Sequence, residues 1–500
     1  MPSKDPIVTT PVLSIGVTTA PTGALLPPDE LVARPLEEIR NVLNSHALQL
    51  LSTADAKTYT AYDTFSLEYD EAIDRAWYAL ATPPKNVLLG YTLVRRAAQG
   101  SFGEVFEALD PKGDRVAIKL LRRDVRREPA MLQTFRRGVR SMRILRKHGV
   151  PGMVGFIDAS EIPAFVVMEW IDGPNLMDAV QSKLLNGWLE NLTVARDLAR
   201  IIHAAHLLPE GVLHRDIRPP NVMLKNYWNN GNEIDVVVMD FDLSWHVDAL
   251  EKSIVAKPLG FMAPEQLHQR SAENTRSALV DSFGLGMTMF YMLTGEIPVP
   301  DQQRHKDWED ILNRKVRARR CTSWKSLPYR VARLINGSTQ DQQRNRWDFS
   351  GIVAELTALI LAHEGETDAV SIDLLGEEIA AHAESMLNYV WDEARNSAVY
   401  KSGGLFIDVH SDVPQGEIDL TMEWRQTGDE NWKLMPKSGA QVMERAKPYL
   451  EKNGWLNAKF EGSYGFMRIT AKFSLENSNF NPAQLGKGID ALVAVMLPKN

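Results

Sequence analysis

An acidic residue at the end of an apolar strand is the feature that most constrains this fold. The run VVVM ends at Asp240, and a carboxylate at the end of a buried strand is costly unless a charged group meets it. In the stretch HRDIRPPN, Asp216 precedes Asn221 by five residues, a spacing that can serve a hydroxyl nucleophile and a metal ion from one loop. Mg²⁺ bound to phosphates would supply the missing charge. Taken singly, each acid also fits a capped loop aspartate.

Three predicted strands between residues 91 and 121 are joined by Gly100-Ser-Phe-Gly103 and by the turn PKGD. A glycine turn that closes a hairpin can fold over a nucleotide, because no Cβ keeps the backbone away from phosphate. An ordinary hairpin turn is the alternative. Lys119 lies on the third strand, in VAIK, and its ammonium can either approach phosphates or extend to the surface along an apolar stem.

Two further motifs follow, Ala263-Pro-Glu265 and then DSFGLG from Asp281, which opens an apolar helix over residues 278–295. Six motifs in this order resemble the protein kinases of the eukaryotic type, in a form similar to the bacterial Ser/Thr kinases. The resemblance covers about residues 91–362. It implies an α+β, two-lobed protein-kinase fold, with a β-rich N-lobe and a helical C-lobe.

The resemblance also implies ATP and Mg²⁺ as cofactors and a protein as substrate. Asp216 would orient the substrate hydroxyl and accept its proton, Lys119 would pair with phosphates, and Asn221 and Asp240 would hold the metal. The nucleotide-binding residues implied are Ala98, Gly100, Gly103, Val105, Ala117, Lys119, Met168, Glu169, Ile171 and Met223. Ala98 stands where the family has its first loop glycine.

Supporting roles follow from the same resemblance. Asn175 falls where the family often contacts ribose, Asp281 would brace the backbone of the catalytic loop, and Glu265 would pair with Arg346 or with Arg344. The sequence Arg218-Pro219 is similar to the Lys-Pro of Ser/Thr kinases, so a Ser/Thr protein kinase is the leading prediction. Two alternatives stay open: a pseudokinase that acts as a nucleotide-binding scaffold or regulator, and a small-molecule kinase.

The predicted helix over 129–147 departs from the family pattern. Gly138 stands where the family has the Glu that pairs with the strand lysine, and no acid lies between residues 129 and 157. Asp242 replaces the Gly that usually ends the DFG motif, and Lys257-Pro258 replaces a Gly-Thr pair. We therefore predict that Lys119 lacks its usual helix partner and that Asp242 is a candidate substitute.

Basic side chains recur along one stripe of that helix. The stripe is either a solvated surface or a dock for an acidic segment such as LEYDEAID, residues 67–74. Its members are Arg136, Arg140, Arg143 and Lys147. Arg215 precedes the catalytic Asp and would meet a phosphate on residues 240–265, where Ser253 is the candidate self-phosphorylation site. Alternatively, Asp248 or Glu251 would be a permanent anionic partner of Arg215.

Texture along the chain predicts five segments. Helical periods in the N-terminal part suggest an extension that packs on the small lobe. A ββαββα order near the C-terminus suggests a small α+β domain that binds a regulatory partner. The segments are a flexible arm (1–28), a helical extension (29–88), the kinase domain (89–362), a helical linker (363–400, with a helix over 374–397) and the accessory domain (401–500).

Composition excludes several classes. The net charge of −8 argues against a general nucleic-acid binder. The single cysteine, Cys321, excludes an intrachain disulfide framework and fits a reducing compartment. The sequence shows neither a signal peptide nor a membrane span, so we expect a cytoplasmic protein.

Overall fold

Contacts within the computed structural model divide the chain into two compact units, each built around its own six-stranded sheet. The first unit is Met1–Asn186, Val194–Arg304 and Gly337–Ile352; the second is Gly187–Thr193, His305–Asn336 and Val353–Asn500. The structure describes residues 25–52, 64–78, 86–100, 102–227, 235–246, 260–267, 274–299, 304–319, 321, 324–364, 374–412, 414–425, 439–463, 466–475 and 480–496.

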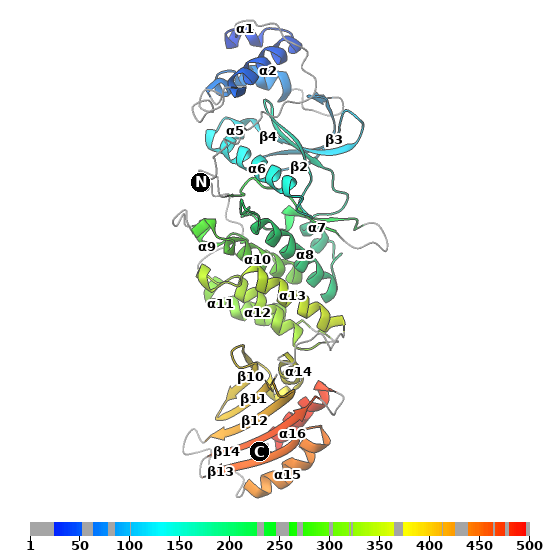
Figure 1. The fold of residues 1–500 in the computed structure, drawn as a ribbon, viewed down its shortest axis with the longest axis vertical. Helices are drawn as coiled ribbons and strands as arrows, with labels where there is room; N and C mark the ends of the chain where they lie inside the picture. Colours follow the sequence, from blue (N-terminus) through cyan, green and yellow to red (C-terminus); the bar gives the residue numbers. More distant parts are fainter. Residues whose placement is uncertain are drawn as a thin grey trace, which may run out of the picture. The chain divides into compact units, whose positions relative to one another are not determined.

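The sheet of the first unit is antiparallel, in the order β1-β2-β3-β4-β6-β5 (Figure 1). It confirms the three strands predicted between residues 91 and 121. The bounds are β1 Asn86–Leu88, β2 Tyr91–Gln99, β3 Gly103–Leu109, β4 Arg115–Leu121, β5 Phe156–Glu161 and β6 Ala164–Glu169.

The register of this sheet gathers five predicted nucleotide-binding residues on one face. Val105 lies opposite Ala98 and Lys119, and Ala117 lies opposite Met168. Directly opposed residues of a ladder share a face, and so do residues two apart on one strand. The β-ladder therefore places the Lys119 side chain on the same face as four other residues expected to bind the nucleotide.

Helix α6, Pro129–His148, confirms the predicted helix over 129–147. Pro129 stands at the start of the helix, where a missing N–H costs nothing. Gly149, with φ of 63°, caps the C-terminus of the helix in the left-handed conformation. Leu132, Phe135 and Met142 are buried along one face, and Gly138 lies within the same buried stripe. The short helix α5, Arg123–Arg126, precedes α6.

The N-terminal extension packs on the sheet, as predicted. Its described helices are α1 Pro28–Val32, α2 Leu36–Ser52 and α4 Asp70–Ile73, which continues into a π turn over Asp74–Tyr78. Trp77 and Leu43 belong to one hydrophobic cluster with Phe106 and Phe165 of the sheet. The cluster joins extension and N-lobe in a single core.

The acidic segment of the extension docks on α5 rather than on the basic stripe of α6. Asp70 accepts hydrogen bonds from Arg126 and Arg127 at 2.7 Å each, and Asp74 accepts from Arg123 at 3.1 Å. Members of the stripe pair elsewhere: Arg136 with Glu161 of β5 at 2.9 Å and Lys147 with Glu210 at 3.6 Å. The docking alternative was therefore right about the acidic segment and wrong about its partner.

The helical part of the first unit carries the remaining motifs. Helix α10 is buried from Val280 to Leu293, which confirms the predicted core helix. Among the described residues, no helix is both long and apolar enough to span a membrane. The elements are α7 Leu176–Gln181, α8 Trp188–His206, β7 Val222–Lys225, β8 Asp235–Val238, α9 Pro264–Leu267 and α10 Leu279–Thr294.

The second unit combines α-helices with an antiparallel sheet in the order β13-β14-β12-β11-β10-β9. Its strands bury alternate residues, so one face packs on helices. The helices are α11 Arg304–Leu312, α12 Leu327–Ser338, α13 Phe349–Glu364, α14 Leu375–His382, α15 Gly439–Lys452 and α16 Pro482–Met496. The strands are β9 Val390–Asp392, β10 Ser397–Ser402, β11 Leu405–Asp412, β12 Glu417–Arg425, β13 Leu456–Ser463 and β14 Phe466–Ser474.

The predicted helix over 374–397 is wrong beyond His382. Helix α14 ends there, and two strands, β9 and β10, extend the sheet that begins the accessory domain. Asn388 and Asn396 adopt φ of 72° and 49°, a left-handed conformation that interrupts a helix. The predicted 363–400 linker is accordingly part helix and part sheet, while the strands and helices predicted after residue 404 are confirmed.

Two buried carboxylates attach α14 to α12. Glu377 forms a bidentate ion pair with Arg333 at 2.9 and 3.0 Å. Glu378 accepts the backbone N–H groups of Lys325 and Ser326 at 2.9 and 2.8 Å, at the start of α12. Because helix N-termini leave backbone donors unsatisfied, Glu378 caps α12 from another helix.

Candidate active site

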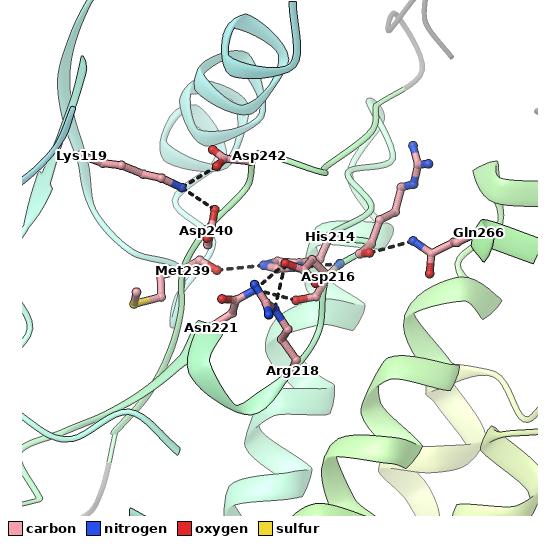
Figure 2. A network of polar contacts seen from close by, with 10 residues as sticks. Lys119, His214, Asp216, Arg218, Asn221, Met239, Asp240, Asp242 and Gln266 are labelled. Carbon is pink, nitrogen blue, oxygen red and sulfur yellow. Dashed lines mark hydrogen bonds and ion pairs between the residues drawn. The ribbon is translucent and has the colours of Figure 1, made fainter. Parts of the chain in front are cut away.

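Lys119 is held by two carboxylates from one short segment (Figure 2). Its Nζ donates to Asp240 Oδ1 at 2.8 Å and to Asp242 Oδ2 at 2.5 Å. Burial alone would lower the pKa of Lys119, but the two carboxylates raise it above its usual value. The lysine is therefore charged and paired, and Asp242, the candidate substitute for a helix glutamate, is one of its two partners.

Asp240 and Asp242 carry different protonation tendencies although they share one lysine. Both are driven toward the neutral form by burial, but Lys119 lowers the pKa of Asp240 to about 2. Burial and the neighbouring Asp240 raise the pKa of Asp242 to about 6. Asp240 also adopts φ of 69°, a conformation that aspartate tolerates better than most residues. Residues 240–242 therefore place two carboxylates around the single ammonium of Lys119.

Asp216 is fixed at the opposite end of the site by two hydrogen-bond donors (Figure 2). Asn221 Nδ2 donates to Asp216 Oδ2 at 2.9 Å and to its backbone carbonyl at 2.8 Å, while Arg218 Nε donates to Oδ2 at 3.1 Å. Burial raises the pKa of Asp216 to about 7, against the opposing effect of Arg218. The HRDIRPPN segment thus forms a closed loop that orients one carboxylate.

His214 connects this loop to the Asp240 segment. Its Nε2 lies 3.0 Å from the Met239 carbonyl, and its Nδ1 lies 3.2 Å from the backbone N–H of Asp216. Burial lowers the pKa of His214, so the ring is neutral. The two contacts then define its tautomer, because Nε2 must donate to the carbonyl and Nδ1 must accept from the amide.

Asp281 of α10 braces the loop from below. Its Oδ2 accepts the N–H of His214 at 2.9 Å and its Oδ1 accepts the N–H of Arg215 at 2.6 Å. Burial opposes its ionisation, but these donors and the His206 ring, whose Nε2 lies 2.8 Å away, lower the pKa of Asp281. Asp281 therefore holds the catalytic-loop backbone, in agreement with the resemblance.

Glu265 pairs with Arg346 and not with Arg344. The two guanidinium nitrogens of Arg346 donate to Glu265 at 2.6 and 2.8 Å, in a buried bidentate pair. Arg344 donates instead to Gln342 at 3.2 Å. Beside this pair, Gln266 Nε2 donates to the Arg215 carbonyl at 2.8 Å and so links α9 to the catalytic loop (Figure 2).

The expected nucleotide residues lie on or beside the N-lobe sheet except Met223, which lies on β7, and three of the expected site residues also have structural contacts. A Cβ at Gly103 would lie 2.5 Å from the Leu120 carbonyl oxygen, so the close approach of β3 to β4 already requires glycine there. Asn175 caps α7 through its side chain, which accepts the N–H of Asp178 at 2.8 Å. Glu169 donates its backbone N–H to the Gly155 carbonyl at 2.8 Å.

Some site residues gave no signal in the sequence. His206 is one of two histidines of α8, and only the fold brings it to Asp281. Gln266 stands next to Glu265, but its contact with the catalytic loop depends on the path of residues 260–267. The segment with Ser253, Asp248, Glu251 and Lys257-Pro258 lies outside the described residues, so predictions on it stay open.

A β-rich lobe with a buried lysine and a helical lobe with a braced Asp–Asn loop define the class of two-lobed protein kinase folds. The family model of the protein kinase domain matches residues 91–356, more than half of the 500-residue chain. The chain belongs to the protein kinase domain family.

Curated relatives are Ser/Thr protein kinases by name. The chain is 29% identical over 217 residues to the serine/threonine-protein kinase Pkn1 of Myxococcus xanthus, covering 42% of this chain and 30% of that protein. It is 32% identical over 239 residues to the serine/threonine-protein kinase A of Synechocystis sp., covering 44% and 43%. The chain therefore spans less than half the length of these two relatives.

A solved structure also matches, the kinase domain of Mycobacterium tuberculosis PknI. The match has a TM-score of 0.41 and 17% sequence identity, and it covers 56% of this chain and all of that one.

Proposed function

We propose that the protein is an ATP- and Mg²⁺-dependent Ser/Thr protein kinase that transfers the γ-phosphoryl group of ATP to a hydroxyl of a protein substrate. The observation that carries the proposal is the pair of charge centres in Figure 2: a buried lysine bonded to Asp240, and an aspartate held by Asn221. The names of the relatives and the Arg218-Pro219 sequence support serine or threonine as the acceptor.

Asp216 is the proposed base. Its Oδ2 is oriented by Arg218 and Asn221, and burial raises its pKa to about 7, which strengthens it as a proton acceptor near neutral pH. The substrate oxygen forms a bond to the γ-phosphorus, the bond from that phosphorus to the β–γ bridging oxygen breaks, and the hydroxyl proton goes to Asp216. Lys119 binds the phosphates that carry the negative charge.

The oxygen atoms of Asn221 and Asp240 fit a magnesium ion by their chemistry. Asn221 spends its amide nitrogen on Asp216, which leaves its carbonyl oxygen as a ligand, and Asp240 contributes a carboxylate. Amide and carboxylate oxygens are the ligands that Mg²⁺ prefers. When bound, the ion would neutralise charge on the β- and γ-phosphate oxygens.

Self-phosphorylation of Ser253 is a second part of the proposal. Burial, together with the neighbouring Arg137 and Arg276, lowers the pKa of the Arg215 guanidinium to about 10. A phosphate on the segment after Asp240 would relieve this repulsion between arginines.

We also propose that the C-terminal sheet domain binds a regulatory partner.

The test compares the full chain with Asp216→Ala, using Mg²⁺, labelled ATP, the chain itself and a generic protein substrate. Removal of a catalytic base is expected to lower the transfer rate by about 10²–10⁴-fold. Asp307→Ala, at an exposed position of α11, is the matched control and should leave transfer unchanged. Equal transfer by wild type and Asp216→Ala would contradict the proposal. ATP binding without any transfer would establish a nucleotide-binding scaffold instead.

A further inference from the structure

Helix α6 touches the segment after Asp240 at the position where the family places its glutamate. A Cβ built on Gly138 would lie 2.9 Å from the Phe241 carbonyl oxygen and 3.2 Å from its carbonyl carbon. Real Cβ atoms essentially never approach backbone closer than 3.0 Å, so the helix can lie this close only with glycine at 138. The contact explains a glycine that is otherwise unfavourable inside a helix.

Polar contacts along the same face of α6 hold the segment in place. Arg137 donates to the Asp242 carbonyl at 3.5 Å. One turn further on, Ser244 Oγ donates to Ser141 Oγ at 2.8 Å, and Ser141 Oγ lies 3.3 Å from His246 Nδ1. Residues 137, 138 and 141 share one side of a helix, so a single helical face carries all these contacts.

The seated segment delivers its own carboxylate to Lys119. Asp242 Oδ2 lies 2.5 Å from Nζ, and the Asp242 side chain is only 16% exposed. Asp240, the other partner, has a second duty under the proposed function, because its carboxylate would also bind the metal. Asp242 is therefore the anion that stays available to Lys119.

We infer that the acid that positions Lys119 comes from the segment after Asp240 instead of from α6. Asp242 is the positioning residue for Lys119, and the missing side chain of Gly138 lets α6 pack against the backbone that carries Asp242. This inference rests on the proposed function for the role of Lys119 toward phosphates. In this arrangement α6 still sets the position of Lys119, but it acts through the backbone of Phe241 and Asp242 instead of through a side chain of its own.

A double-mutant cycle on the full chain tests the inference. The variants are Asp242→Asn, Lys119→Met and the double variant. The matched control is Asp124→Asn, which changes an exposed carboxylate that pairs with nearby Arg122. The first readout is the affinity for MgATP. Asp242→Asn should weaken binding about tenfold when Lys119 is present and should not weaken it in the Lys119→Met background. Asp124→Asn should leave the affinity unchanged.

The second readout is thermal unfolding without nucleotide. Asp242→Asn should lower the unfolding temperature of the wild type, because Lys119 loses a partner. In Lys119→Met it should raise that temperature, because it removes the repulsion between two acids that no longer share a cation. This increase in unfolding temperature can be measured even if Lys119→Met alone is poorly folded.

Equal weakening of MgATP binding in both backgrounds, or additive changes in unfolding temperature, would overturn the inference. Failure of the proposed function looks different, since it would abolish phosphate transfer in the wild type while the coupling between Lys119 and Asp242 persists. A wild type that binds no MgATP would overturn both.

Discussion

The two ends of the active site are held in different ways. At the Asp216 end, a buried acid of α10 binds two consecutive backbone N–H groups and a histidine of α8. At the Lys119 end, one ammonium is held by two acids of a single segment, which lies where it does because α6 approaches its backbone. The catalytic loop is thus held by a buried acid from a different element, while the lysine is held by acids of one three-residue segment.

Asp281→Ala should break the Asp216 end and have the largest effect. It leaves the N–H groups of His214 and Arg215 buried without their acceptor, and loss of such a buried charged group costs about 3–5 kcal/mol. Urea unfolding measures the loss of stability, and phosphate transfer should fall together with it. Asp307→Ala, at an exposed position of α11, is the control. Retention of both stability and transfer in Asp281→Ala would show that the loop does not need this brace.

Gly138→Ala should break the lysine end through shape alone. The new methyl group would lie 2.9 Å from the Phe241 carbonyl oxygen, so α6 or the segment must move, at a cost of about 1–3 kcal/mol. We expect weaker MgATP binding as well, because the shift carries Asp242 away from Lys119. Thermal unfolding and nucleotide titration are the measurements.

Gly351→Ala in α13 is the matched control for this glycine. A Cβ there would meet only Asp348 Oδ1 at 3.5 Å, an ordinary contact. At an exposed helix position Ala is more favourable than Gly by up to about 1 kcal/mol, so this variant should be slightly more stable than the wild type. If Gly138→Ala behaved in the same way, the close approach of α6 would not constrain the site.

The sequence predicts the frame of the site because its signals are local. Short strand-like runs separated by turn sequences define β2 to β4, a helical period defines α6, and the motif order places Lys119, Asp216, Asn221 and Asp240. The absence of an acid on α6 is likewise visible in the sequence, and with it the vacancy beside Lys119. These predictions need only neighbours along the chain.

What the sequence does not reveal depends on contacts between distant residues. The approach of Gly138 to Phe241 spans about a hundred residues, and its distance decides that no side chain fits. The acidic segment with Asp70 selected Arg126 rather than the stripe of α6, although both are basic. The helix predicted over 374–397 failed because apolar spacing there also suits strands, and pairing of β10 with β11 decided the outcome.

Removal of an arginine that pairs with Asp70 should have the smallest effect on stability among these variants, and it tests whether the extension supports the lysine end. Arg126 is 4% exposed and donates to Asp70 at 2.7 Å, whereas Arg123 is 44% exposed and donates at 3.3 Å. Arg126→Ala should cost about 1–2 kcal/mol, because it removes a hydrogen bond to a buried charge. Arg123→Ala should cost less than about 1 kcal/mol, as exposed ion pairs do. Both are measured by urea unfolding.

Because α5 leads directly into α6, the Arg126 variant should also weaken MgATP binding slightly, while Arg123→Ala serves as its control. Equal costs for the two variants would mean that the extension does not support the lysine end through this buried pair.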